Sequence, residues 1–376
     1  MDPVWTVGLM TGTVLDGYID VALLKTDGET IAEFGPYALV PYPDDINAML
    51  EQTLAIANDW SFKGPEPELF AKVEDALTLA QSAAVRQVVI EAGMTMDQIA
   101  AVGFHGQTVL HRAPTPKRNG VTRQLGNGNL MASFLDTDVV YDFRSADMAA
   151  GGQGAPLAAI YHAALLRGLN APTSTAVLNL GGVANITWRG PDDTLVAFDT
   201  GPANAPINDY MKSIGQGVMD VDGTLAAQGT VDEALLAHRM ILPYLSQAYP
   251  KSLDRFDFGF DWIAGLSPQD GAATLTAFSA AAVGKALDLL PERPTRLIVC
   301  GGGRRNPTLM QQVALRTGVK IELAEDHGWR GDAIEAECFG FLAMRVLRGM
   351  PISFPTTTGV PSPMIGGKVA KGQVPA

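Results

Sequence analysis

The chain has 376 residues, of which 47% are apolar and 18% charged, the proportions of an ordinary globular protein long enough for two domains. Its 27 basic and 40 acidic residues give a net charge of −13. Such a charge argues against nucleic acid or an anionic membrane as a partner, and a negatively charged substrate would need a local basic pocket.

Cysteine usage and the N-terminal residues indicate the compartment. Cys300 and Cys338 lie in apolar surroundings without metal-ligand spacing, so we expect reduced core residues. The N-terminus shows no basic region followed by an apolar one, and no apolar run approaches membrane-spanning length. We therefore expect a cytoplasmic protein without a membrane partner.

The first elements are two short strands around a Gly/Thr turn. Apolar runs at 5–10 and 19–24 predict the strands, and residues 11–13 between them read Thr-Gly-Thr. Their hydroxyls and the Gly12 N–H suit phosphate oxygens, while Asp16 and Asp20 are oxygen ligands of the kind Mg²⁺ takes. Taken alone, Asp16-Gly17 is merely a good turn dipeptide.

The rest of the first half alternates scaffold with polar strand ends. We predict a helix at 66–91, a buried strand at 99–104 and a loop at 119–129. The strand leads into His105-Gly106-Gln107-Thr108, which is either structural or one wall of a substrate site. A strand at 138–141 leads to Arg144, whose guanidinium suits a carboxylate or phosphate if it is not merely solvated. A helix at 157–167, with Pro156 in its first turn, follows.

The second half opens on another strand–turn–strand pattern. Runs at 176–180 and 185–188 flank Gly181-Gly182, and a third run, 195–198, ends on Asp199. The glycines allow close approach to a ligand, and their N–H groups could face an anion. We expect Asp199 at the lip of a tight loop, as phosphoryl transfer would need. The plain alternatives are an ordinary turn and a helix cap at Asp199 or Thr200.

A glycine loop follows a later buried strand. Helices are predicted at 205–214, 270–290 and 332–347, and a strand at 296–300 that runs into Gly301-Gly302-Gly303. Asn306 as N-cap and Pro307 begin the next helix. Strand, glycine loop and helix commonly hold a nucleotide, but neither the dinucleotide fingerprint nor the P-loop motif is present.

Taken together, these motifs resemble the anhydro-N-acetylmuramic acid kinase family of the sugar kinase/heat-shock-70/actin superfamily. The matching segments run in one order from Gly8 to about Gly367: 8–13 with 15–17, 103–108, 142–144, 150–156, 179–185, 198–202, 300–303 with Asn306, 334–337 and 358–359. The resemblance implies an α/β fold of two RNase-H-like domains, 1–145 and 146–376, with ATP in the interdomain cleft and a C-terminal tail that may cross back.

The chain departs from the family pattern at several positions. Thr11 and Val14 replace serines, and one extra residue precedes Asp20. Ala203 replaces a glycine, and 250–255 differs enough that we assign no substrate contact there. Losing a hydroxyl at Val14 removes a possible phosphate or metal contact.

The resemblance implies ATP- and Mg²⁺-dependent phosphorylation of a small sugar in peptidoglycan recycling, by a homodimer. In the reaction that the resemblance implies, water attacks C1 of the 1,6-anhydro sugar and the released O6 takes the γ-phosphoryl group. Asp199 is the candidate for the base. Asp16 is the metal candidate. Nucleotide candidates are Gly12, Thr13, Val14, Leu15, Asp16, Gly17, Asp20, Gly181, Gly182, Asn185, Gly301, Gly302, Gly303 and Asn306. Sugar candidates are His105, Gln107, Arg144, Gly201, Asn204 and Glu335.

Two other functions remain open at this point. One is an ordinary sugar or sugar-acid kinase in which Asp199 deprotonates a hydroxyl. The other is an actin-like regulatory module that binds ATP without turning over a sugar. The polar set Gln107, Arg144, Gln153 and Glu335 argues against the regulatory module, because a pure switch needs no polar sugar pocket.

Overall fold

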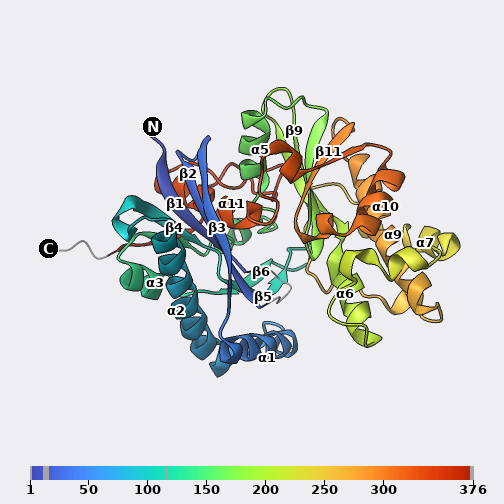
Figure 1. The fold of residues 1–376 in the computed structure, drawn as a ribbon, viewed down its shortest axis with the longest axis horizontal. Coiled ribbons are helices and arrows are strands. Elements are labelled where there is room, and N and C mark those ends of the chain that lie inside the picture. Colours follow the sequence, from blue (N-terminus) through green and yellow to red (C-terminus); the bar gives the residue numbers. More distant parts are fainter. Residues whose placement is uncertain (1, 12–16, 116, 373–376) are drawn as a thin grey trace. The chain divides into compact units, whose positions relative to one another are not determined.

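The computed structural model describes residues 2–11, 17–115 and 117–372 (Figure 1). Its contacts divide the chain into two compact units. The first comprises Met1–Gly168 and Ala333–Ala376, and the second comprises Leu169–Asp332. The first unit thus runs past the boundary expected at residue 145 and also takes up the C-terminal segment. The physical reason is that the last long helix and the final strand pack on the sheet of the first unit.

The sheet of the first unit has the strand order β13-β7-β4-β1-β2-β3. β1, β2 and β3 form an antiparallel meander. β4 and β7 run parallel to β1, and β13 pairs antiparallel with β7. The strands are β1 (Val4–Met10), β2 (Tyr18–Thr26), β3 (Ile31–Pro41), β4 (Ile99–Phe104), β7 (Val139–Tyr141) and β13 (Lys368–Ala370).

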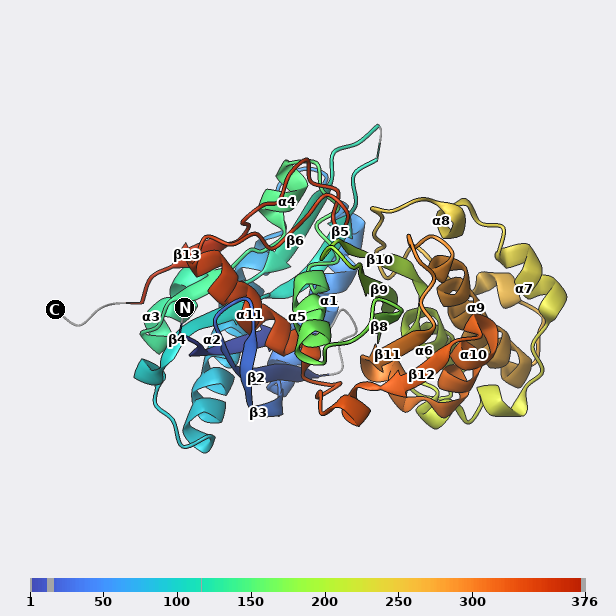
Figure 2. The same ribbon diagram turned by 90° about the horizontal axis from the view of Figure 1, so that it is seen from above.

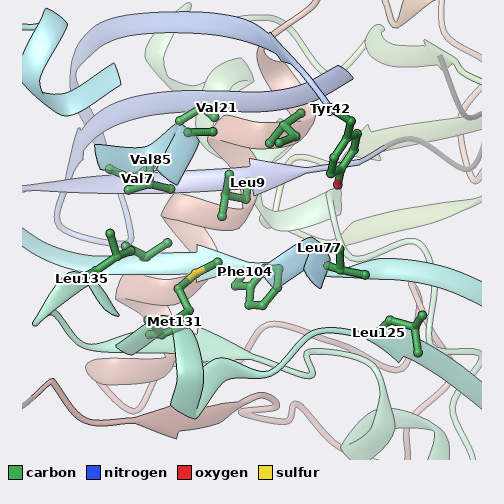
Figure 3. Packing of buried hydrophobic residues seen from close by; sticks show 14 of the residues in the cluster. Val7, Leu9, Val21, Tyr42, Leu77, Val85, Phe104, Leu125, Met131 and Leu135 are labelled. Carbon is green, nitrogen blue, oxygen red and sulfur yellow. The ribbon is translucent and has the colours of Figure 1, made fainter. Parts of the chain in front are cut away.

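Helices pack on both faces of this sheet. Val7 and Leu9 of β1 share a buried cluster with Leu77 of α2 (Glu68–Glu91), and Figure 3 shows these side chains together. Gly8 points to the opposite face, because successive strand residues alternate. A Cβ at Gly8 would lie 1.7 Å from the backbone oxygen of Ala336, so only glycine lets α11 (Ile334–Leu347) come this close. The remaining helices are α1 (Asp44–Trp60), α3 (Gly128–Leu135), α4 (Ser145–Ala149) and α5 (Ala159–Gly168).

The second unit repeats the topology of the first. Its sheet has the order β10-β9-β8-β11-β12, with three antiparallel strands followed by two parallel ones. Five strands of the first unit, β3-β2-β1-β4-β7, have the same order and directions. The strands are β8 (Thr175–Leu180), β9 (Val183–Arg189), β10 (Leu195–Pro202), β11 (Arg296–Cys300) and β12 (Lys320–Leu323). The predicted pair of RNase-H-like α/β folds is confirmed.

Two long helices pack together on this second sheet (Figure 2). Val283 and Leu287 of α9 (Pro268–Leu287) and Val313 of α10 (Pro307–Thr317) join the cluster that contains Phe198 and Leu178. Three shorter helices are α6 (Asn204–Ser213), α7 (Glu233–Arg239) and α8 (Pro243–Ser246). Among the residues that the structure describes, no helix is long and apolar enough to span a bilayer.

Two expected elements are wrong in part. The loop expected at 119–129 contains β6 (Val121–Leu125), which pairs with β5 (Gln107–Arg112), and α3 begins at Gly128. β6 is polar and only partly buried, so the sequence has no apolar pattern that would predict this strand. The helix expected at 157–167 begins at Ala159, and Pro156 precedes it instead of lying in its first turn.

Candidate active site

A row of polar side chains crosses the sheet of the second unit. Asp199 on β10 lies opposite Asn185 on β9, and Asn185 lies opposite Asn179 on β8. Directly paired residues project from the same face of a sheet, so these three side chains form one polar row. Within the described part of the chain, the buried Oδ1 of Asn185 has no hydrogen-bond partner. The row therefore offers a carboxylate and an amide oxygen side by side.

Asp199 is buried within β10. The expectation that it lies at the lip of a tight loop is wrong. The residue is 6% exposed, and β10 continues to Pro202 through a register irregularity after Asp199. That irregularity accommodates the Thr-Gly-Pro sequence that we took for a loop. The cap reading is also wrong, since Ala203 is the N-cap of α6 and the Thr200 hydroxyl donates to the Ala184 carbonyl instead.

Hydrogen bonds from α8 and from the segment that follows it hold Asp199 in place. Its Oδ2 accepts from the backbone N–H of Leu253 at 2.8 Å, and its own N–H donates to the Lys251 carbonyl at 3.2 Å. The Tyr244 hydroxyl donates to the Asp199 carbonyl at 2.8 Å. The carboxylate is thus fixed in position before any ligand arrives, as a catalytic base requires.

The Gly181–Gly182 turn is attached to the start of α6. The Gly181 carbonyl accepts from the backbone N–H and Nδ2 of Asn204 at 3.0 and 2.8 Å, and the Gly182 carbonyl accepts from the backbone N–H of Ala203 at 3.0 Å. The Asn204 amide therefore supports the turn. A Cβ at Gly201 would lie 2.7 Å from that of Ala282 in α9, so this glycine serves packing. Sugar contacts by Gly201 and Asn204 stay predictions.

The Gly301–Asn306 loop lies beside the polar row. Gly301 has φ 76° and ψ 165°, and a Cβ there would lie 2.2 Å from Oδ1 of Asn179. A Cβ at Gly302, by contrast, would meet no described heavy atom within 4 Å. Asn306 is confirmed as the N-cap of α10, accepting from the Leu309 N–H at 2.9 Å. The loop is rigid at Gly301 and open at Gly302, which suits a nucleotide.

An arginine clamp holds this loop, and sequence reasoning missed it. The Arg304 side chain is 5% exposed and contacts Glu325 at 2.6 Å and Asp332 at 2.8 Å, while Nη1 donates to the Gly301 carbonyl at 3.1 Å. Burial opposes the charge of Arg304, but the hydrogen bonds that it donates to Asp332 and Glu325 leave its pKa raised. Both carboxylates lie more than 20 residues along the chain from Arg304, beyond any local pattern.

The first unit brings two of the sugar candidates into direct contact. Arg144 donates to Nε2 of His105 from Nε at 3.1 Å and from Nη2 at 2.9 Å, and its Nη1 donates to the Gly154 carbonyl at 2.7 Å. Nδ1 of His105 donates to the Gly106 carbonyl at 2.7 Å. Burial and then the charge of Arg144 hold the pKa of His105 well below its usual value, so the ring is neutral. It accepts from Arg144 and fixes the guanidinium plane.

Glu335 and Gln107 lie near this pair. The charges of both Glu335 and Arg144 act on the buried thiol of Cys338, whose pKa is raised mainly by burial. The His105 ring packs on the neighbouring Phe339 of α11, with centroids 4.6 Å apart. Gln107 begins β5 two residues after His105 and is fully buried. These candidates therefore share one region of the first unit.

The first phosphate turn is only partly covered by the structure. Gly12, Thr13, Val14, Leu15 and Asp16, and with them the metal candidate, lie outside the described residues. Gly17 follows with φ 85°, and Asp20 pairs with Met10 across the end of β1. No group of three or more His, Cys, Asp or Glu side chains suited to a metal occurs among the described residues.

Comparisons with known proteins match this chain over nearly its whole length. The family model for anhydro-N-acetylmuramic acid kinase matches residues 4–371. The anhydro-N-acetylmuramic acid kinases of Rhizobium rhizogenes and Mesorhizobium japonicum are each 66% identical, covering 99% and 98% of this chain and all of each relative. That of Caulobacter vibrioides is 47% identical over 96% of this chain and 98% of its own.

Solved structures are more distant. Component A of the (R)-2-hydroxyglutaryl-CoA dehydratase from Acidaminococcus fermentans is 14% identical, with a TM-score of 0.47 over 91% of this chain and 98% of that chain. A TM-score at this level carries no argument. The full-length family match and the relatives at 66% identity do, and this chain belongs to the anhydro-N-acetylmuramic acid kinase family.

Proposed function

We propose that this chain is an enzyme that opens 1,6-anhydro-N-acetylmuramic acid with water and phosphorylates its O6 from ATP, in the recycling of cell-wall peptidoglycan. Water forms a bond to C1 and gives its proton to Asp199. The bond between C1 and the bridging oxygen breaks, and that oxygen, now O6, takes the γ-phosphoryl group while ADP leaves. The product is N-acetylmuramic acid 6-phosphate.

The observation that carries this proposal is the fixed and buried carboxylate of Asp199. It is 6% exposed and oriented by the Leu253 N–H, so it can act as a base without first being ordered. Asn185 stands beside it with a buried amide oxygen. A base that takes a proton from water contributes typically 10²–10⁴-fold to a rate.

The nucleotide side of the site is the Gly181–Gly182 turn and the Gly301–Asn306 loop. Both lie next to the polar row, and the Arg304 clamp orders the second of them. MgATP is the phosphoryl donor, with Asp16 and the 12–17 turn as the expected contacts of the metal and phosphates. Backbone N–H groups and a cation at the transferred group are what phosphoryl transfer requires.

We assign the sugar contacts to the region around Arg144 in the first unit. A guanidinium held in one plane by His105 and Gly154 suits the lactyl carboxylate of the substrate, because arginine recognises carboxylates with paired donors. Glu335 and Gln107 are the remaining polar candidates. We further propose that the protein acts in the cytoplasm, where ATP is available, as a homodimer, and light scattering on the purified protein tests that state.

A substrate panel tests the proposed function. Purified enzyme with MgATP should convert 1,6-anhydro-N-acetylmuramic acid to a sugar phosphate, followed by ³¹P NMR and by ADP release. Free N-acetylmuramic acid, N-acetylglucosamine and common sugars and sugar acids should react at least about a hundredfold more slowly, since they have no bridge to open and most lack the lactyl group. Preference for a free sugar would make the chain an ordinary sugar kinase, and ATP binding without turnover would make it a regulatory module.

A further inference from the structure

Lys251 is a buried lysine in the segment that contacts the candidate base Asp199. Its side chain is 1% exposed, and Nζ donates to the Tyr244 carbonyl at 2.9 Å. The ammonium also lies 4.5 Å from the centroid of the Tyr244 ring and 5.3 Å from that of Phe198, on the strand that carries Asp199. A buried ammonium is costly unless a counter-charge compensates it.

Residues 244–253, which we call the strap, join this lysine to Asp199. The strap contacts Asp199 at three points already described: the Tyr244 hydroxyl, the Lys251 carbonyl and the Leu253 N–H. Lys251 in turn bonds back to Tyr244 inside the strap. The position of the carboxylate and that of the ammonium are therefore set by the same ten residues.

Charges around Lys251 act in opposite directions. Burial lowers the pKa of Lys251, the charge of Asp199 raises it, and the charge of Lys285 on α9 lowers it further, to about 8. Burial, the charge of Asp199 and that of Asp257 raise the pKa of Tyr244, which keeps its hydroxyl protonated. Asp199 is thus the carboxylate whose charge acts on both Lys251 and Tyr244.

We propose that Lys251 is a positioning residue for Asp199: its buried ammonium, bonded to the Tyr244 carbonyl, holds the strap that fixes the carboxylate for the water that attacks the sugar. The inference rests on the proposed function for the identity of the base. It adds a dependence of the rate on a second titrating group. The rate is highest while Asp199 is a carboxylate and Lys251 an ammonium.

The direction of the pH dependence follows from the bond between Lys251 and Tyr244. A charged donor makes a stronger hydrogen bond than a neutral one. Deprotonation therefore weakens the bond from Lys251 to the Tyr244 carbonyl. Since Lys251 deprotonates near pH 8, the wild-type rate should fall above that pH.

The test is the pH profile of kcat/KM for Lys251→Met, which keeps most of the side-chain volume but not the charge. We expect a lower kcat/KM at neutral pH, and the alkaline limb near pH 8 should disappear because the variant has no ammonium to lose there. The KM for ATP should stay within about twofold.

Lys285→Met is the matched control. Lys285 donates to the Met240 carbonyl at 2.8 Å, and its charge lowers the pKa of Lys251. Its removal should therefore move the alkaline limb to higher pH and leave the acid limb and the rate at neutral pH near those of the wild type. A lysine that mattered only for packing would not make the alkaline limb disappear in one variant and move to higher pH in the other.

A measurement without substrate separates this inference from the proposed function. With ¹³Cε-labelled lysine, the NMR signal missing from Lys251→Met (or from Lys251→Arg, if Met unfolds the protein) should titrate near pH 8 in the wild type and at lower pH in Asp199→Asn. An unchanged titration in Asp199→Asn, or unchanged limbs in an active Lys251→Met, overturns the role of Lys251. A wild-type enzyme inert towards anhydro-sugar overturns the proposed function alone.

Discussion

Alanine substitutions at two adjacent glycines of the Gly301–Asn306 loop should have different effects, on folding at Gly301 and on ATP binding at Gly302. Gly301 has φ 76° and ψ 165°, a region that only glycine readily occupies, and forcing alanine into it costs of order 1–3 kcal/mol. The added Cβ would also lie 2.2 Å from Oδ1 of Asn179. Overpacking of this kind costs about 1–3 kcal/mol more. Gly301→Ala should therefore lose at least about 2 kcal/mol of folding free energy, the sum of the two lower bounds.

Gly302→Ala is the comparison. Its Cβ would meet none of the described heavy atoms within 4 Å, so thermal stability should stay within about 1 °C of the wild type. If the nucleotide lies against this open side, the methyl group should raise the KM for ATP. Gly301→Ala should instead lower Tm by at least about 4 °C, taking roughly 2 °C per kcal/mol for a chain of this size.

The assay is thermal unfolding by circular dichroism, with the KM for ATP measured on the same preparations. A Gly301→Ala protein as stable as the wild type would refute the argument that this loop is rigid. A Gly302→Ala protein with normal stability and an unchanged KM for ATP would remove the nucleotide from this side of the loop.

Two further predictions concern the first unit. Arg144→Ala should raise the KM for the lactyl-bearing anhydro-sugar roughly tenfold or more relative to a neutral analogue, because a charge-assisted bond is lost only with the former. Equal effects on both sugars would leave Arg144 with its structural bonds to His105 and Gly154 alone. His162 is buried, and burial lowers its pKa from 6.5 to about 4. The unfolded state therefore takes up a proton first as pH falls below 6.5, and stability drops by about 2 kcal/mol between pH 7 and pH 5 on its account. Urea unfolding of His162→Gln at the two pH values should show a smaller drop than the wild type, and an equal drop would exclude this cause.

The elements that sequence could predict are those with a local apolar signal. The run at 296–300 coincides with β11, and Asn306 and Pro307 begin α10 as expected. The polar strand β6 has no such signal, and the edge strand β3 is apolar in sequence but contains Gly35 and Pro36, which are typical of a turn. The position of Asp199 was misread for a related reason. A bulge lets a strand continue through Thr-Gly-Pro, and only the partner strand reveals it.

The contacts that support the site depend on residues far apart in the chain. The Leu253 N–H reaches Asp199 over 54 positions, and the Tyr244 hydroxyl over 45. Arg304 meets Asp332 over 28 positions. No spacing rule links such residues, since their proximity follows from the packing of whole elements. Motifs therefore suggested the candidate reacting groups, and the folded chain was needed to find what orients them.

The central claim is that Asp199 activates water which attacks C1 of the anhydro-sugar. Its most direct test is the reaction in ¹⁸O-labelled water, with wild type and Asp199→Asn compared by mass spectrometry and ³¹P NMR. Asparagine can still accept from the Leu253 N–H, so fold and ATP affinity should persist while kcat falls by at least roughly 10²-fold. The account predicts label at C1 and none in the phosphate, with ring opening and phosphorylation falling together in the variant. Label in the phosphate, or an Asp199→Asn enzyme with unchanged kcat, would contradict it.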